Sequence, residues 1–138
     1  MIAVQLTEGG KVKRMYTMRI NDFSAQSLQY IFVDHISRKA NVTTDQWRGY
    51  RPIAKAYNIT QIPSNNGMNF KALHTMIHQV KSWIRRTYSW VSDDNLNRYF
   101  NEFCFKINRS QSKSTIFNNL ITKMVQGDKI YHKELISN

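Results

Sequence analysis

The order in which β-type and helical patterns follow one another is the feature that most constrains the fold of this chain. Residues 1–6 and 12–20 are rich in β-forming residues, and Gly9 and Gly10 stand between them. Adjacent glycines can supply the positive φ values that a tight chain reversal needs. The sequence therefore predicts a β-hairpin at the N-terminus.

Elements of alternating type follow the hairpin. Ser24 offers an N-cap to a helix whose apolar side chains recur at three- and four-residue steps. Residues 40–44 have the pattern of a strand, residues 47–57 that of a helix, and residues 59–62 that of a second strand, which stops at Pro63. The predicted order of hairpin, helix, strand, helix, strand and helix is that of an α/β domain.

The chain from Phe70 onward is helical almost to its end. Its first helix, residues 70–88, carries a buried stripe expected to pack on the sheet, formed by Leu73, Ile77, Val80 and Ile84. His74 and Lys81 each follow a stripe position by one residue and lie seven residues apart, which places both side chains on one face beside that stripe.

Two more helices are expected in the C-terminal third. One begins near residues 92–94, where polar side chains can cap it. Its aromatic-rich stripe is expected to be core rather than a platform for stacking bases, and it consists of Leu96, Tyr99, Phe100, Phe103 and Ile107. The other covers Ile116 to Met124 and ends near Gly127. Residues 1–126 are therefore predicted to form the domain and residues 127–138 a peripheral tail.

The charge balance favours a polyanionic partner. The 138 residues include 20 Lys and Arg against 9 Asp and Glu, a formal net charge of +11. Cations placed against phosphates release condensed counterions, so nucleic acid is the leading candidate, and an ordinary solvated basic surface is the alternative. Cys104 is the single cysteine, which excludes an internal disulfide and a Cys-paired zinc site. Without a signal peptide core or a long apolar run, a cytoplasmic protein without a membrane partner is expected.

Several spaced motifs resemble those of one family. Between Thr17 and Leu120 the chain is similar to the C-terminal half of DDE-type insertion-sequence transposases with a Thr-Asp-x-Trp-x-Gly-Tyr motif. The motifs occur in the family's order: Thr44-Asp45-Gln46-Trp47-Arg48-Gly49-Tyr50, Lys81, Arg86-Thr87-Tyr88-Ser89-Trp90-Val91-Ser92, Leu96-Asn97-Arg98-Tyr99-Phe100-Asn101-Glu102-Phe103 and Asn108-Arg109.

The resemblance implies a ribonuclease H-like fold, a mixed central sheet flanked by helices, in which acidic residues hold two divalent metal ions. On that pattern Asp45 is the second acid, His74 stands where the third is usually Glu, and Lys81 is the basic residue seven positions beyond. The expected cofactor is Mg²⁺ or Mn²⁺, because carboxylates suit Mg²⁺ and imidazole suits Mn²⁺ better. Lys81, Arg85 and Arg86 would contact DNA phosphates, and a homo-oligomer stays open.

The first acid of the resembled family has no counterpart here. It belongs on a strand directly upstream of the opening hairpin, whereas Asp22 lies in a strand-to-helix turn where helix capping is the obvious role. The chain is therefore interpreted as an N-terminally truncated transposase that lacks the first strand and is inactive alone.

Duller and different functions stay open beside that interpretation. Asp45 can cap a turn, His74 can be a partly buried helix residue, and Lys81 with Arg85 and Arg86 can form a solvated edge. His74 and His78 are also spaced like metal ligands, but no tetrahedral zinc set completes them. A non-catalytic DNA-binding remnant is the runner-up. An independent nuclease ranks last, because it would need a complete carboxylate set within this chain.

Overall fold

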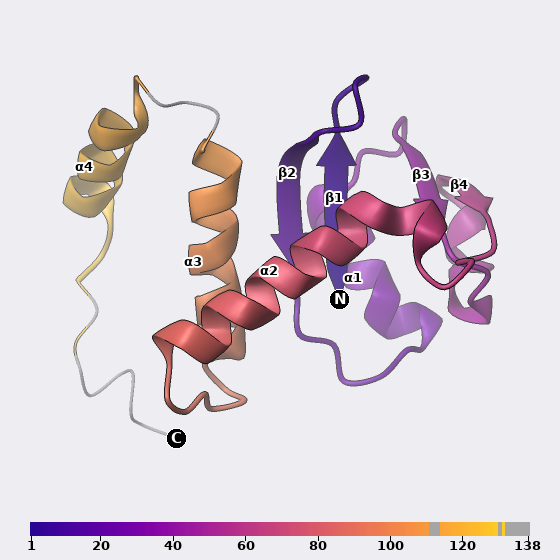
Figure 1. The fold of residues 1–138 in the computed structure, drawn as a ribbon. Coiled ribbons are helices and arrows are strands. Elements are labelled where there is room, and N and C mark those ends of the chain that lie inside the picture. The colour runs from indigo at the N-terminus through magenta and orange to yellow at the C-terminus, as the bar shows by residue number, and fades with distance from the viewer. Residues whose placement is uncertain (111–113, 130, 132–138) are drawn as a thin grey trace.

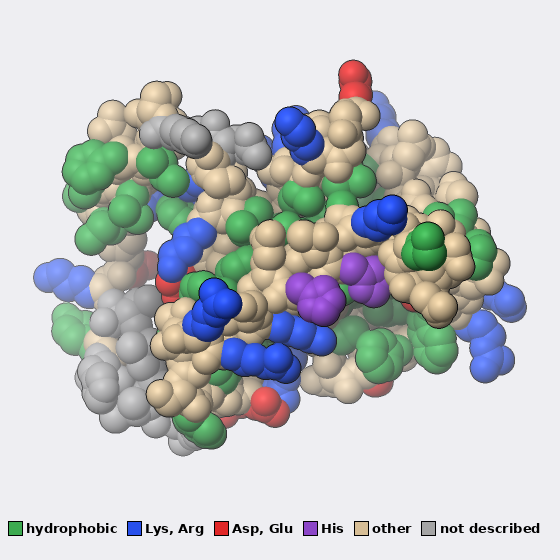
Figure 2. All heavy atoms as spheres, viewed as in Figure 1, with side chains coloured by type: hydrophobic (Ala, Val, Ile, Leu, Met, Phe, Trp, Pro, Cys, Tyr) green, Lys and Arg blue, Asp and Glu red, His purple; other side chains and the backbone are tan. Residues whose placement is uncertain are grey.

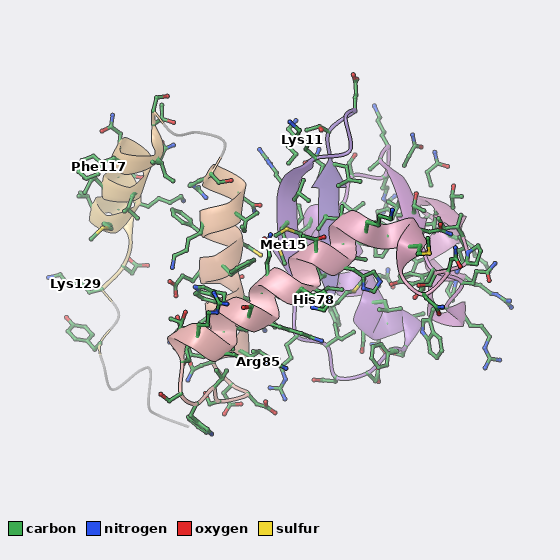
Figure 3. The ribbon with its side chains drawn as sticks, viewed as in Figure 1. Lys11, Met15, His78, Arg85, Phe117 and Lys129 are labelled. Carbon is green, nitrogen blue, oxygen red and sulfur yellow. The ribbon has the colours of Figure 1, made fainter. Side chains whose placement is uncertain are left out.

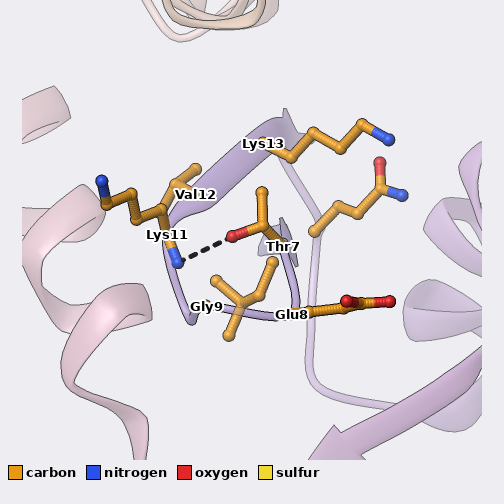
Figure 4. Close-up of a pocket in the computed structure, with 8 residues that line it drawn as sticks. Thr7, Glu8, Gly9, Lys11, Val12 and Lys13 are labelled. Carbon is orange, nitrogen blue, oxygen red and sulfur yellow. Dashed lines mark hydrogen bonds between the residues drawn. The ribbon is translucent and has the colours of Figure 1, made fainter.

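The N-terminal hairpin forms as predicted. The computed structural model of the chain describes residues 1–110, 114–129 and 131. Strand β1 (Ile2–Leu6) pairs antiparallel with β2 (Val12–Thr17), and Gly10 has the positive φ of 75° that the turn requires. Figure 4 shows this end of the hairpin, where the N–H of Lys11 donates to the Thr7 hydroxyl at 3.2 Å.

Helix α1 (Ala25–His35) begins at the residue predicted to cap it. The hydroxyl of Ser24 accepts a hydrogen bond from the N–H of Ser27 at 3.2 Å. In the same turn the carboxylate of Asp22 accepts from the N–H of Ser24 at 2.9 Å. Hydrogen bonds from Ser24, and then from Ser27, hold the pKa of Asp22 below its usual value. Ser24 is therefore the capping residue, and Asp22 holds the turn that precedes the helix rather than capping it.

A second pair of strands follows, and the segment between them differs from the prediction. Strands β3 (Asn41–Thr44) and β4 (Asn58–Gln61) pair in parallel. The helix predicted for residues 47–57 is wrong, because two short 3₁₀ turns, η1 (Arg48–Tyr50) and η2 (Ile53–Lys55), replace it. Pro52 has no N–H to donate to the carbonyl of Arg48, so an α-helical ladder cannot run through this segment.

The described strands form two separate two-stranded sheets rather than the single mixed sheet that was expected. In Figure 1 the two pairs stand beside one another with β1 and β3 as the inner strands. Side chains from both pairs, such as Ala3 and Val42, pack on one cluster over α1. The arrangement is a mixed α/β domain in which β1 and β3 each keep one edge without a strand partner among the described residues.

The core consists of two clusters on opposite faces of the hairpin (Figure 1). The first lies between the hairpin and the helices α2 (Lys71–Thr87) and α3 (Leu96–Arg109), and its buried residues are Met15, Met76, Val80, Phe103 and Cys104. The second surrounds α1, and its buried residues are Leu28, Ile31, Phe32, Ile53 and Tyr57. Figure 3 shows Met15 between the hairpin and α2.

The predicted stripes on α2 and α3 are largely, but not wholly, the buried ones. On α2 the fully buried residues are Met76 and Val80, whereas Leu73 and Ile77 are half-buried. The buried face is therefore rotated toward Met76 relative to the prediction. On α3 the prediction of a core stripe is confirmed for Phe103, which is buried, and for Phe100 and Ile107, which pack on the first cluster, whereas Leu96 and Tyr99 are half-buried outside it.

The last helix stands apart from the rest of the molecule. Helix α4 (Ile116–Gln126) ends before Gly127, as predicted, but no other described helix or strand packs extensively on it (Figures 1 and 3). All its large apolar side chains are exposed, Phe117 to 68% and Val125 to 79%. Most of the predicted tail, residues 130 and 132–138, lies outside the described residues. No helix in the described part of the chain is long and apolar enough to cross a membrane.

Candidate functional site

Asp45 stands immediately beyond the carboxyl end of β3, as predicted, and its side chain is exposed. One carboxylate oxygen accepts a hydrogen bond from the N–H of Trp47 at 3.2 Å, which is the turn-capping role. The backbone carbonyl of Asp45 accepts from the side-chain amide of Gln61, at the end of β4, at 3.0 Å. Asp45 thus lies at the edge where both parallel strands end. Burial, and then the nearby Asp45 carboxylate, raise the pKa of Tyr50.

The residues that follow Asp45 fix this turn against α1. The indole N–H of Trp47 donates to the carbonyl of Phe23 at 2.9 Å. Gly49 lies so close to α1 that an added Cβ would be 2.8 Å from a methyl carbon of Leu28. Trp47 and Gly49 thus hold the 3₁₀ segment against α1 and the residues just before it.

His74 lies in the first turns of α2 and contacts the loop that follows β4. Gly67 in that loop has a φ of 85°, and a Cβ added there would be 2.7 Å from Nε2 of His74. The imidazole ring therefore lies against the backbone of Gly67, in the space that a Cβ at this position would need. Because β3 and β4 are parallel, both strands finish at the same end of the sheet, so the loop after β4 begins at the end where Asp45 lies. The fold thus directs the segments that carry Asp45 and His74 to one edge of this small sheet.

Lys81, Arg85 and Arg86 line one shallow hollow of about 420 Å³ on the exposed side of α2. His78 and Ser82 complete its lining. Figure 2 shows histidine side chains beside Lys and Arg side chains along the face of α2 turned to the viewer, and Figure 3 locates His78 and Arg85 on that helix.

This hollow is electrostatically one-sided. Helix α2 contains no Asp or Glu in its 17 residues, and Arg85 and Arg86 lie in its last turn. The partial negative charge of a helix C-terminus favours cations there. Neither of the two salt bridges seen among the described residues, Arg19 with Asp93 and Lys106 with Glu102, involves a side chain of the hollow. The hollow is therefore suited to an anionic ligand.

The sequence reasoning did not assign His78 and Ser82 to a binding site. Their positions carry a signal, because residues 81 and 82 lie three and four positions after residue 78, and residue 85 lies four and three positions after them, so all four share one face. The hollow does not include Asp45 or His74. No group of three or more His, Cys, Asp or Glu positioned to hold a metal ion occurs among residues 1–110, 114–129 and 131. Cys104 is buried and free, with its sulfur 3.2 Å from the hydroxyl of Thr17.

The class that these observations define is a mixed α/β domain with an exposed acid at a strand end and a separate helix that carries basic side chains and no acid. The particular family follows from comparison with known proteins. Residues 1–108 match the family model described as the ISXO2-like transposase domain, so the chain belongs to this transposase family. No significant match was found among curated proteins or among solved structures.

Proposed function

We propose that this chain acts on DNA in transposition, and that α2 is its principal contact with the DNA backbone. The observation that carries the proposal is the basic hollow on an acid-free helix in a chain of a transposase family. Lys81, Arg85 and Arg86 bind phosphates there. Arginine offers a planar fork of donors that matches phosphate oxygens, and lysine acts as a point charge.

The proposed chemistry is metal-dependent phosphodiester cleavage and strand transfer. Asp45 and His74 are the proposed metal ligands, because each has an exposed side chain, and the loop that His74 contacts leaves parallel β4 at the end of the sheet where Asp45 follows β3. The exposed carboxylate of Asp45 suits Mg²⁺ or Mn²⁺, and the imidazole of His74 favours Mn²⁺. When bound, divalent ions would stabilise the charge that develops on the attacking and leaving oxygens. The chain's own contribution is to hold the phosphates in place beside them.

The ligand set that we assign is incomplete, so we propose that residues 1–138 alone do not catalyse the reaction. Asp45 and His74 supply two protein ligands, and two-metal chemistry needs more. In the ribonuclease H-like arrangement proposed for this family, a central strand carries the first acid. The unpartnered edges of β1 and β3, which are the inner strands of the two sheets, support a place for that strand between them.

The DNA-binding part is tested by the salt dependence of affinity for duplex DNA. Replacing Lys81, Arg85 and Arg86 with alanine should reduce the slope of log affinity against log salt by about two to three, because each lost phosphate contact removes about 0.9. A matched control replaces three exposed cations outside the hollow, Arg38, Lys39 and Lys55. Equal slopes in the two triple variants would favour the alternative of a generally solvated basic surface.

The catalytic part is tested separately. The purified chain should show no Mg²⁺- or Mn²⁺-dependent DNA cleavage or strand transfer, and turnover would contradict the proposal of an incomplete site. The second candidate, a non-catalytic DNA-binding remnant, is favoured by the basic hollow lying apart from Asp45. If Mn²⁺ raises DNA affinity and Asp45→Ala abolishes that increase, the metal site is functional. If affinity is independent of both, the remnant is the better description.

A further inference from the structure

Trp90 is the most exposed aromatic residue in the described part of the chain. It lies in the connector between α2 and α3, and 79% of it is open to solvent. Tryptophan is large and apolar and is highly buried on average in folded proteins. The chain's other tryptophans differ, because Trp83 packs on the first core cluster and Trp47 donates a hydrogen bond to Phe23.

The connector is anchored on the side that precedes Trp90. The ring of Tyr88 packs against Trp83 and Tyr99, with centroid distances of 5.5 and 4.3 Å. Its hydroxyl donates to the carboxylate of Glu102 at 2.8 Å. Burial, and then the hydrogen bond to Glu102, raise the pKa of Tyr88 to about 12, so this hydroxyl keeps its proton at neutral pH. The backbone two residues before Trp90 is therefore fixed to α3.

The connector is also anchored on the side that follows Trp90. The hydroxyl of Ser92 accepts hydrogen bonds from the backbone and side-chain N–H groups of Asn95, at 3.3 and 2.9 Å. The guanidinium of Arg19, just beyond β2, donates to the carbonyl and the carboxylate of Asp93 at 3.0 and 3.1 Å. The exposed indole is thus carried by a segment held at both ends.

Along the chain, Trp90 follows shortly after the basic hollow. Arg86 lines the hollow and precedes Trp90 by four residues, so their Cα atoms lie no more than about 14 Å apart. Cationic side chains that track a backbone, next to an aromatic face, are the arrangement that binds unpaired nucleotides. We propose that Trp90 stacks on an unpaired DNA base whose flanking phosphates occupy the hollow. This inference rests on the proposed function of the hollow.

The chemistry favours an unpaired base over a base within a duplex. In an intact duplex each base is already stacked on its neighbours, so a side chain outside the stack gains a π-face only where a strand is frayed or single-stranded. The net charge of +11 favours nucleic acid as the partner over an apolar surface with few acidic groups. The predicted ligand is therefore a DNA end with a short single-stranded extension.

The test compares a blunt duplex with the same duplex carrying a four-nucleotide 3′ or 5′ extension. Wild-type protein should bind one extended duplex more tightly, and Trp90→Ala should lower that affinity by about 5- to 100-fold with little change for the blunt duplex. Trp90→Phe, which keeps an aromatic face, should retain most of the preference. Phe117→Ala, at an aromatic residue of α4 that is 68% exposed, is the matched control and should change neither affinity.

The outcomes separate this inference from the proposed function. Equal affinity for blunt and extended duplexes in the wild type, or an unchanged preference in Trp90→Ala, would overturn the stacking role and leave the hollow intact. A uniform loss on every DNA in Trp90→Ala would also overturn it. Weaker binding of every DNA in the Lys81, Arg85 and Arg86 triple variant, together with a wild-type preference for extended DNA that Trp90→Ala removes, would support both.

Discussion

Asn108 joins α3 to the outer edge of the hairpin, and its removal should destabilise the fold measurably. Its side-chain oxygen accepts from the N–H of Met15 at 2.6 Å, and its side-chain nitrogen donates to the carbonyl of Met15 at 2.9 Å. Met15 is fully buried, at 0% exposure. The amide therefore pairs with β2 as a neighbouring strand would, and it satisfies two backbone groups that water does not reach readily.

Asn108→Ala leaves both backbone groups without these partners. A buried polar group that loses its hydrogen bond costs about 1–3 kcal/mol, so two such groups, partly relieved by entering water, should lower the free energy of unfolding by about 2–4 kcal/mol. Urea unfolding followed by circular dichroism measures this loss. The m-value, which is the slope of the unfolding free energy against urea concentration, should not change.

Asn97→Ala is the matched control for this prediction. Asn97 also accepts from the backbone of the hairpin side, at the N–H of Arg19 and 2.8 Å, but there the groups are exposed and water can replace the amide. The expected loss is below about 1 kcal/mol. Equal losses in the two variants, or a loss under about 1 kcal/mol for Asn108→Ala, would refute the reasoning that burial of Met15 sets the magnitude.

Three further predictions concern the candidate site and the connector. Gly67→Ala should lower the free energy of unfolding by about 1–2 kcal/mol, because a left-handed φ of 85° disfavours a Cβ. The contact of that Cβ with His74 should add to this loss. In a His74→Ala background the added loss should vanish, and an unchanged loss would show that the contact does not matter. Asp45→Asn should weaken Mn²⁺ binding measured by electron paramagnetic resonance, and equal binding would remove Asp45 from the metal site. Because the pKa of Tyr88 is raised to about 12 from 10.0, its contribution to stability is present below pH 10 and is lost as the pH rises toward 12. Tyr88→Phe should remove that loss, and ultraviolet titration should show a lower pKa in Glu102→Gln.

Local signals in the sequence predicted local structure well. The Gly10 turn, the Ser24 cap and the core stripe around Phe103 depend on neighbours within a few residues, and each is confirmed. The wrong prediction at residues 47–57 has a local cause too, since Pro52 lies inside the predicted helix and interrupts its hydrogen bonds. Strand pairing is different, because partners distant in the chain decide it. No local pattern in the sequence tells which strands pair with one another. A single sheet was expected, and the structure has two separate pairs of strands.

The candidate site was predicted in part. Lys81 and Arg86 belong to the motifs of the resemblance and Arg85 to the same basic edge, and the structure brings these three to one hollow, whereas their role in binding stays a prediction. His78 was considered only as a metal ligand paired with His74, although its helical spacing from Lys81 and Ser82 places it on their face. The metal roles of Asp45 and His74 also stay predictions. The spacing of residues along the chain does not determine the distance between an acid at the end of a strand and a residue on a later helix.

The isolation of α4 has a consequence for local unfolding of the molecule. A helix of 11 residues on which no other described element packs extensively gains little from packing, and helices this short are marginal in water by themselves. Its amide hydrogens should therefore exchange with deuterium far sooner than those of α2 and α3, which enclose the first core cluster. The chain thus carries one segment that can open and re-form while the remainder stays closed.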